Sequence, residues 1–183
     1  MNRNVKLFGI IVIGLTVVIF CLYYFMMTST KKHSPLEVVE LRQNGLEVDV
    51  AYCRPYKKDR LIFGSEESGA LQPYGQYWRM GANEATVITV NESINFGGEE
   101  LGPGSYSIYA FPGVGEWQIG INSDTGQWGY SEPDYDDELF RVTVPVEYVD
   151  EVTEQFTITF ETVGENTNMV LRWDTSVVKI PIR

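Results

Sequence analysis

One feature near the start of the sequence constrains the whole chain, an uncharged run from Leu7 to Met27. About 20 apolar residues are enough to cross the hydrocarbon core of a bilayer as one helix. The rest of the chain has the mixed polarity of a water-soluble domain. The sequence therefore predicts four parts, which are an N-terminal tail at 1–6, a transmembrane anchor at 7–27, a linker at 28–35 and one domain at 36–183.

A signal peptide that is cleaved after export is the alternative to a retained anchor. Its apolar region is about 7 to 15 residues long and ends at small side chains. Here the run ends in the bulky segment 23–27, which suits the aromatic belt of a membrane interface. Cys21 follows Phe20, which lacks the small side chain needed before a lipid-modified cysteine. A retained anchor is the preferred prediction.

Charge indicates on which side of the membrane the domain lies. Arg3 and Lys6 precede the apolar run. Lys31 and Lys32 follow it, so the flanking charges nearly balance. All 25 acidic residues and 12 of the 14 basic ones come after Met27, which gives that part of the chain a net charge of −13. Such an acidic domain is a poor ligand for nucleic acid or anionic lipid. We expect a cytoplasmic N-terminus and a domain on the periplasmic side of the cell membrane.

Apolar side chains recur at every second residue through most of the domain, which is the period of a strand with one buried face. In the first such segment, Val48 and Val50 alternate with Asp49. The segments with this pattern run from Leu46 to Tyr52, Trp117 to Ile121, Phe140 to Val144, Phe156 to Phe160, Met169 to Trp173 and Val178 to Ile182. No segment of helical period in the domain matches their length. The domain is therefore predicted to be all-β, with roughly ten short strands.

Turn residues separate the predicted strands. Asn44-Gly45 suits a two-residue hairpin, and Gly97-Gly98 and 164–166 are similar signals. Many short strands that are each polar on one face predict a two-sheet antiparallel β-sandwich. Jelly-roll and immunoglobulin-like connections fit this pattern equally well. Cys53 is the only cysteine of the domain, so the sandwich must be stable without an internal disulfide.

Chemically capable side chains are densest in the segment 73–86. Aromatic rings, a guanidinium, an amide and a carboxylate lie close together there. An aromatic wall with a few polar groups is typical of a ligand pocket. We therefore predict a site for a glycan or peptide ligand, formed here by Tyr74, Trp78, Arg79, Asn83 and Glu84. The alternative is structural: an Arg79–Glu84 pair clamps an irregular crossover, and Trp78 fills the sandwich.

Trp128 completes the predicted site. Tryptophan and tyrosine suit a ligand face because each joins an apolar body to a polar tip. Trp128 follows a turn at 124–126, so we expect its ring to be exposed. Trp117 and Trp173 are in phase with buried strand positions and are expected in the core.

Several short motifs in the domain also match a known family in order along the chain. The motifs are Arg54-Pro55, the segment 60–64, Pro73-Tyr74-Gly75, Trp78-Arg79, the segments 81–86 and 104–107, Gln127-Trp128-Gly129 and Leu171-Arg172-Trp173. By these motifs the chain resembles domain-of-unknown-function family 2911, an uncharacterised bacterial family. Two departures are Leu101-Gly102-Pro103-Gly104 in place of the usual Leu-Pro-x-Gly, and a longer loop at 65–70. The resemblance implies export to the envelope and an all-β domain, and it brings no reaction or catalytic residue.

Missing residue types exclude several kinds of chemistry. His33 is the only histidine and lies beside the apolar run, so a serine or cysteine nucleophile in the domain lacks an imidazole base. One thiol without imidazoles does not form a closed zinc site. The sequence contains neither a phosphate-binding glycine loop nor a dinucleotide fingerprint. We therefore expect no metal, no cofactor, no nucleotide and no nucleic acid partner.

Two chemistries that need only carboxylates remain. A glycoside hydrolase uses two carboxylates as acid and base. The candidates for such a pair are Glu84, Asp134, Asp136, Asp137, Glu138 and Glu161. The acidic segment 132–138 has the oxygen ligands that calcium prefers, but it lacks the glycine and the alternation of an EF-hand loop. A solvated acidic loop is the preferred interpretation.

These inferences lead to one prediction of function. We expect a membrane-anchored envelope protein without catalytic residues, whose domain is a binding or accessory module for a glycan or peptide ligand. The alternative is a carboxylate-based glycoside hydrolase. Two carboxylates that face each other across a cleft would distinguish the hydrolase from the binding module. The sequence leaves the oligomeric state open.

Overall fold

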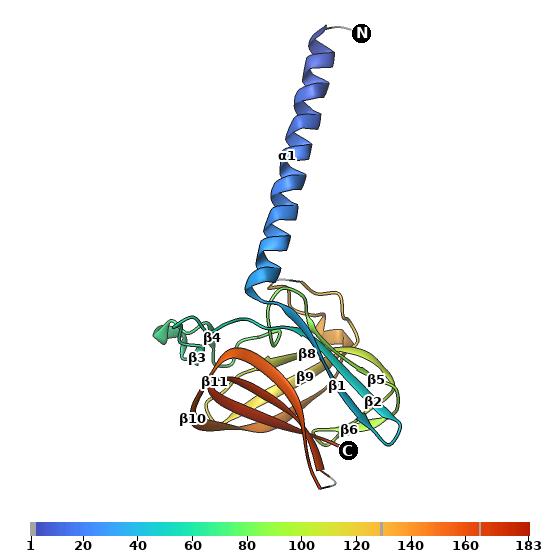
Figure 1. Ribbon diagram of the computed structural model, residues 1–183, viewed down its shortest axis with the longest axis vertical. Coiled ribbons are helices and arrows are strands. Elements are labelled where there is room, and N and C mark those ends of the chain that lie inside the picture. Colours follow the sequence, from blue (N-terminus) through green and yellow to red (C-terminus); the bar gives the residue numbers. More distant parts are fainter. Residues whose placement is uncertain (1–2, 129, 165) are drawn as a thin grey trace. The chain divides into compact units, whose positions relative to one another are not determined.

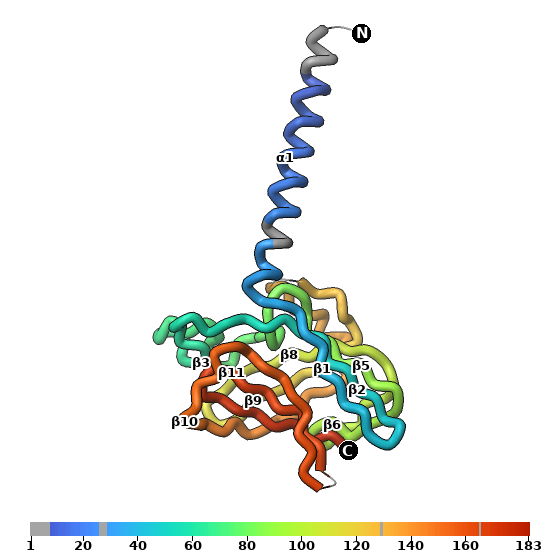
Figure 2. The backbone as a smooth tube through the Cα atoms, viewed as in Figure 1, coloured from blue at the N-terminus to red at the C-terminus, as the bar shows by residue number. Residues whose placement is uncertain are grey.

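The computed structural model describes residues 3–128, 130–164 and 166–183, and for residues 3–7 and 26–28 it describes the backbone alone. Figure 2 draws in grey the residues that are left out and those described by their backbone alone. The chain divides into two compact units, a helix that ends at His33 and a domain that begins at Ser34.

Helix α1 runs from Arg3 to His33 and is the only α-helix in the described residues. Its part Phe8–His33 is long and apolar enough to cross a membrane. The helix extends through residues 28–33 of the expected linker and ends on basic residues, which the helix dipole favours at a C-terminus. A signal sequence passes the same test of length and composition, so the retained anchor stays a prediction.

The prediction of an all-β antiparallel domain is confirmed. Within the described residues, nine strands form one sheet in the order β1-β2-β5-β8-β9-β10-β11-β6-β7 (Figure 1). Their bounds are β1 Leu36–Gln43, β2 Leu46–Cys53, β5 Thr86–Val90, β6 Ile94–Phe96, β7 Glu99–Leu101, β8 Gly104–Phe111, β9 Glu116–Asn122, β10 Glu138–Val163 and β11 Asn166–Ile182. The short strands β3 Phe63–Gly64 and β4 Gln72–Pro73 pair in parallel beside it. Two 3-10 turns, η1 Glu66–Ser68 and η2 Tyr135–Asp137, complete the elements.

The two layers of the domain are joined by the long strand β10. Its first part, 138–145, pairs with β9, and its later part, 146–163, pairs with β11 with two shifts of register. Figure 1 shows β10 and β11 curving across the strands β8 and β9. The two short strands expected at Phe140–Val144 and Phe156–Phe160 are therefore parts of a single bent strand.

Strand β11 also unites two segments that the sequence pattern separates. Met169, Leu171 and Trp173 belong to the core, and after them the core positions are Val178, Ile180 and Ile182. Asp174 lies at the change and has a left-handed backbone with φ of 55°. The register of β10 against β11 shifts on either side of the Thr153–Asp174 pair, which marks a bulge there. A change of phase at such a bulge gives one irregular strand the pattern of two.

A seam of backbone hydrogen bonds connects the segment after β2 with the middle of β10. The Phe156 N–H donates to the Pro55 carbonyl at 2.9 Å, and the Lys57 N–H donates to the Glu154 carbonyl at 2.7 Å. The buried Tyr52 hydroxyl accepts from the Ile158 N–H at 2.9 Å. Figure 2 shows β1 passing beside β10 near this seam. The seam therefore ties one layer to the other.

The expected hairpin turns are present. Asn44 and Gly45 have φ of 53° and 92°, and Gly97 and Gly98 have φ of 61° and 111°. Positive φ at both central residues is the requirement of the turn that matches strand twist. Gly164 follows β10 and has φ of 63°, whereas the next residue of the predicted turn lies outside the described residues.

The core lies between the two layers and includes a cluster of aromatic rings. Both layers contribute aliphatic side chains to it, including Val48, Val50, Ile88, Ile108, Ile119, Ile158, Leu171 and Ile180. The rings of this cluster are Phe63, Trp78, Trp117, Phe156 and Trp173. Trp117 and Trp173 are each only 2% exposed, so both lie in the core as predicted.

Candidate functional site

Trp78 belongs to the core. Its ring is 2% exposed and stacks on Trp173, while its backbone exchanges two hydrogen bonds of 2.8 Å with Ala110 of β8. These contacts favour the structural role that the sequence offers as an alternative to a ligand-contacting wall. Trp78 is therefore left out of the site proposed below.

The residues after Trp78 form a loop with an unusual backbone. Met80 and Asn83 have φ of 55° and 59°, in the left-handed region that residues other than glycine rarely adopt. Gly81 has φ of 150°, and a Cβ there would lie 2.7 Å from the Cys53 carbonyl oxygen. The Thr86 hydroxyl donates to the Met80 carbonyl at 2.6 Å and holds the loop closed. Residues held in rare backbone conformations cluster at functional sites, so this loop is a candidate.

Asn83 and Glu84 are tied to the start of the domain and to β2. The buried Asn83 amide donates to the Ser34 carbonyl at 3.4 Å. The Cys53 thiol donates to a carboxylate oxygen of Glu84 at 3.3 Å. Burial, together with this bond, raises the pKa of the Cys53 thiol. Cys53 is thus a protonated, buried cysteine and a weak nucleophile.

Arg79 lies beneath the ring of Tyr130. The guanidinium carbon is 5.2 Å from the ring centroid, within the range of a cation–π contact. Its Nε is buried, and among the described residues it has no hydrogen-bond partner. Burial lowers the pKa of Arg79, although a guanidinium remains charged at any physiological pH.

Trp128 lies beside this loop and is exposed, as predicted. Its backbone forms an isolated antiparallel bridge with Glu84, and 45% of the residue is exposed. Tyr130, two positions later, is 87% exposed. The structure therefore brings Arg79, Asn83, Glu84 and Trp128 into one region.

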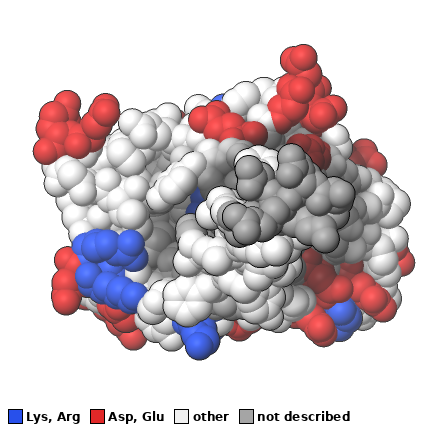
Figure 3. All heavy atoms as spheres, turned by 90° about the horizontal axis from the view of Figure 1, so that it is seen from above, with Lys and Arg blue, Asp and Glu red and all other residues white. Residues whose placement is uncertain are grey.

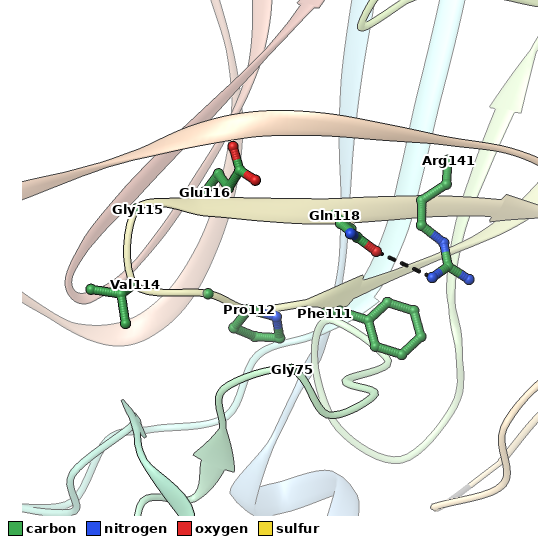
Figure 4. Close-up of a pocket in the computed structure, with 9 residues that line it drawn as sticks. Gly75, Phe111, Pro112, Val114, Gly115, Glu116, Gln118 and Arg141 are labelled. Atoms are coloured by element: carbon green, nitrogen blue, oxygen red, sulfur yellow. Dashed lines mark hydrogen bonds between the residues drawn. The ribbon is translucent and has the colours of Figure 1, made fainter.

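Tyr74, the remaining predicted residue, precedes a residue that lines a groove, which the sequence does not reveal. Tyr74 is half-buried against the core, and the next residue, Gly75, donates its N–H to the Pro112 carbonyl at 2.7 Å. The groove has a volume of about 460 Å³. Its lining residues, shown in Figure 4, are Gly75, Phe111, Pro112, Gly113, Val114, Gly115, Glu116, Gln118 and Arg141.

The turn between β8 and β9 forms one wall of the groove. Gly113 is required there, because a Cβ at that position would lie 2.4 Å from the Glu116 carbonyl oxygen. The Val114 carbonyl accepts a hydrogen bond of 2.9 Å from the Tyr148 hydroxyl of β10. These contacts fix the turn and with it the shape of the groove.

Polar side chains from β9 and β10 form the opposite wall. Arg141 donates to the Gln118 side-chain oxygen at 3.3 Å, the contact drawn in Figure 4. It also pairs with Glu138 at 2.6 Å. Its guanidinium carbon lies 4.4 Å from the ring centroid of Phe111. Arg141 is thus held in place by an anion and an aromatic ring.

A cluster of tyrosines extends from Phe111 on the outer face of β8. Tyr77 lies 5.5 Å from Tyr109 and 6.3 Å from Phe111, measured between ring centroids. Tyr135 contacts the same two rings at 6.0 Å and 6.4 Å. Burial raises the pKa of Tyr77 to about 12. The cluster connects the groove to the segment that contains Arg79.

Carboxylates are spread over the domain rather than concentrated in the groove. Glu138 accepts from Arg141 and from the Tyr109 hydroxyl, Glu161 pairs with Arg172, and Asp134 caps η2 through the Asp136 N–H. Glu116 is the one carboxylate among the residues that line the groove. Figure 3 likewise shows acidic side chains at several separate places around one face of the molecule.

Comparison with known proteins places the domain in a family. A family model described as "Protein of unknown function (DUF2911)" matches residues 34–182. The chain belongs to the DUF2911 family. This confirms the resemblance seen in the sequence motifs. No curated protein and no solved structure matches the chain.

The DUF2911 match begins at the start of the β domain and includes both the loop after Trp78 and the groove. Sequence reasoning located the loop because chemically diverse residues are adjacent there. It missed Phe111, Gln118 and Arg141, which are far apart in the sequence and carry no motif. Their one sequence signal is position, since each faces away from the core in its strand.

Proposed function

We propose that this DUF2911 protein is a membrane-anchored envelope protein whose β domain binds a glycan without catalysis. The groove between the β8–β9 turn and Arg141 is the observation that carries the proposal. Its volume of about 460 Å³ lies within the usual range of small-molecule sites.

The chemistry of the groove suits a sugar. Phe111, Pro112 and Val114 provide apolar surface for the C–H face of a pyranose ring. Glu116 and Gln118 provide acceptors and donors for hydroxyl groups, and Arg141 provides charge-assisted donors. Because the Arg141 side chain is already positioned by Glu138, little rotamer entropy is lost on binding.

The positions and contacts of the carboxylates favour binding over glycoside hydrolysis. Hydrolysis requires two carboxyl groups that flank the scissile bond, about 5 to 10 Å apart. Glu116 is alone among the residues that line the groove, and the carboxylate of Glu138 is engaged by Tyr109 and Arg141. A fixed set of donors with one acid supports recognition rather than bond cleavage.

Helix α1 supports the membrane part of the proposal. In the most apolar stretch of Phe8–His33, none of the described residues is buried against the rest of the chain. We place the N-terminus in the cytoplasm and the acidic domain outside it. Protease treatment of intact spheroplasts should digest the domain, and digestion only after lysis would contradict this orientation.

A ligand screen tests the binding proposal. The full-length chain in detergent micelles is screened against immobilised glycans, peptidoglycan fragments and a peptide library. We expect glycan binding that Gln118→Ala and Glu116→Gln each weaken by about tenfold, the effect of losing one hydrogen bond to a polar ligand. The matched control is Glu100→Gln, at an exposed position of β7. Binding only to peptides, or turnover of a glycan, would overturn the proposal.

A further inference from the structure

Arg79 differs from most of the other arginines of the domain, which are Arg42, Arg54, Arg60, Arg141, Arg172 and Arg183. Four of these pair with carboxylates, namely Arg42, Arg54, Arg141 and Arg172. In the part of the chain that the structure describes, no ion pair includes Arg79, and its buried Nε donates to nothing. A buried donor without a partner costs free energy, so such a group in a native structure calls for a ligand or another explanation.

Among the described residues, no carboxylate pairs with the charge of Arg79. The groups that favour its charged form are Tyr130, Tyr77 and Cys53, none of which is a carboxylate. Tyr130 covers the guanidinium on one side and is itself 87% exposed. The guanidinium is therefore partly desolvated, close to the surface, and not paired with a carboxylate of the described residues. Charge-assisted hydrogen bonds are strong in such a setting.

Arg79 and the groove are connected along one side of the segment 75–79. Gly75 lines the groove at one end. Trp78 points into the core, whereas Tyr77 contacts Phe111 of the groove wall and Arg79 contacts Tyr130. A chain-like ligand that begins in the groove can therefore reach Arg79 across Tyr77.

We propose that Arg79 binds a carboxylate of the ligand, and that the glycan bound by this domain is therefore an acidic one. The inference rests on the proposed function. The Nε and one terminal nitrogen of a guanidinium match the two oxygens of a carboxylate in a bidentate pair. The loop of Met80, Gly81 and Asn83 holds its conformation before any ligand binds, which limits the entropy lost on binding.

A carboxylate fits this site better than a phosphate group does. One guanidinium supplies a single positive charge, and the chain as a whole carries −11. A dianionic group would meet the repulsion of that net charge with only one cation to offset it. A uronic-acid type of sugar places one charge on each residue and matches the single arginine.

Two measurements on the full-length chain in detergent micelles test the inference. In the first, the Nε–H resonance of Arg79 is followed by NMR during titration with sodium acetate, with sodium chloride as the reference. In the second, calorimetry compares an oligogalacturonate with a neutral oligogalactose of the same length. We expect acetate to shift the resonance, and the acidic oligomer to bind about tenfold more tightly.

Variants separate charge from shape. Arg79→Gln should bind both oligomers equally, Arg79→Lys should keep only part of the preference, and Arg42→Gln should bind as the unchanged chain does. Equal thermal melting of the variants shows that they are folded. No response to acetate, or a preference that survives Arg79→Gln, overturns the inference. A response to acetate with no binding of either oligomer leaves the anion site standing and removes the proposed function.

Discussion

The indole rings of Trp78 and Trp173 are stacked, with centroids 5.7 Å apart and planes inclined by 21°. Trp173 belongs to β11 in one layer, and the backbone of Trp78 is bonded to Ala110 of β8 in the other. Trp78 therefore links the two layers within the aromatic cluster of the core. Both indole N–H groups are buried, and neither has a hydrogen-bond partner among the described residues. The packing of the rings must offset that cost.

Replacing Trp78 should mainly affect stability. Trp78→Ala removes a fully packed ring and leaves a cavity, so the free energy of unfolding should fall by about 3 to 5 kcal/mol. Trp78→Phe should cost less, because it keeps an aromatic ring and removes the unpartnered N–H. Urea denaturation followed by circular dichroism measures both changes.

Trp128 provides the matched control for Trp78. It is the same residue type but 45% exposed, so Trp128→Ala should change the free energy of unfolding by less than about 1 kcal/mol. Equal losses at the two positions would contradict the assignment of Trp78 to the core and Trp128 to the surface.

Gly120 should be needed for the tyrosine cluster. A Cβ at Gly120 would lie 2.3 Å from the ring of Tyr109, which covers this position on β9. Gly120→Ala should therefore displace the ring and lower the free energy of unfolding by about 1 to 3 kcal/mol. In a chain that already carries Tyr109→Ala, Gly120→Ala should lower the free energy of unfolding by less than it does in the unchanged chain. Gly102→Ala, where a Cβ meets nothing within 4 Å, is the control; a similar loss there would sink the explanation.

The sequence predicts the strand content of the domain well because burial of one face imposes a two-residue period. Val48 and Val50 of β2, and Trp117 and Ile119 of β9, are buried in the expected phase. The number and length of strands are predicted less well. The bulge at Asp174 changes phase inside one strand, and alternation contains no information about which strands pair.

The candidate site is predictable only where its residues are adjacent in the sequence. Arg79 is found because the loop concentrates polar and aromatic groups, and Trp128 because a turn precedes it. Phe111 and Arg141 meet only after β8, β9 and β10 have paired. Trp78 has the composition of a binding residue, and its burial depends on which way a short irregular segment points.

Alkaline pH should destabilise the domain through its buried tyrosines. Burial raises the pKa of Tyr77 from 10.0 to about 12. The pKa of Tyr109 is also raised, mainly by burial and to a smaller extent by its hydrogen bond to Glu138. Between pH 10 and 12 the unfolded chain loses these protons while the folded chain keeps them. The free energy of unfolding should therefore fall as pH rises through this range, and these groups add no pH dependence below it.

Tyr77→Phe isolates the contribution of one ring to this effect. The variant should show a shallower fall of unfolding free energy between about pH 9 and pH 12, measured by urea denaturation at several pH values. Identical slopes in the variant and the unchanged chain would show that Tyr77 is not held protonated by burial.

Asp174 should contribute to stability in two separable ways, through its charge and through its backbone. Its carboxylate pairs with Lys57 at 2.8 Å, and both side chains are less than one-fifth exposed, at 17% and 19%. Its φ of 55° is one that asparagine tolerates and that a β-branched residue strongly disfavours. Asp174→Asn should therefore lower the free energy of unfolding by about 1 kcal/mol through the lost ion pair, and Asp174→Val should lower it by about 1 to 2 kcal/mol more.

Urea denaturation of both variants, each also combined with Lys57→Met, separates the two effects. In the Lys57→Met background the cost of Asn should vanish and the additional cost of Val should remain; a Val variant as stable as the Asn variant would show that the bulge does not depend on this backbone conformation.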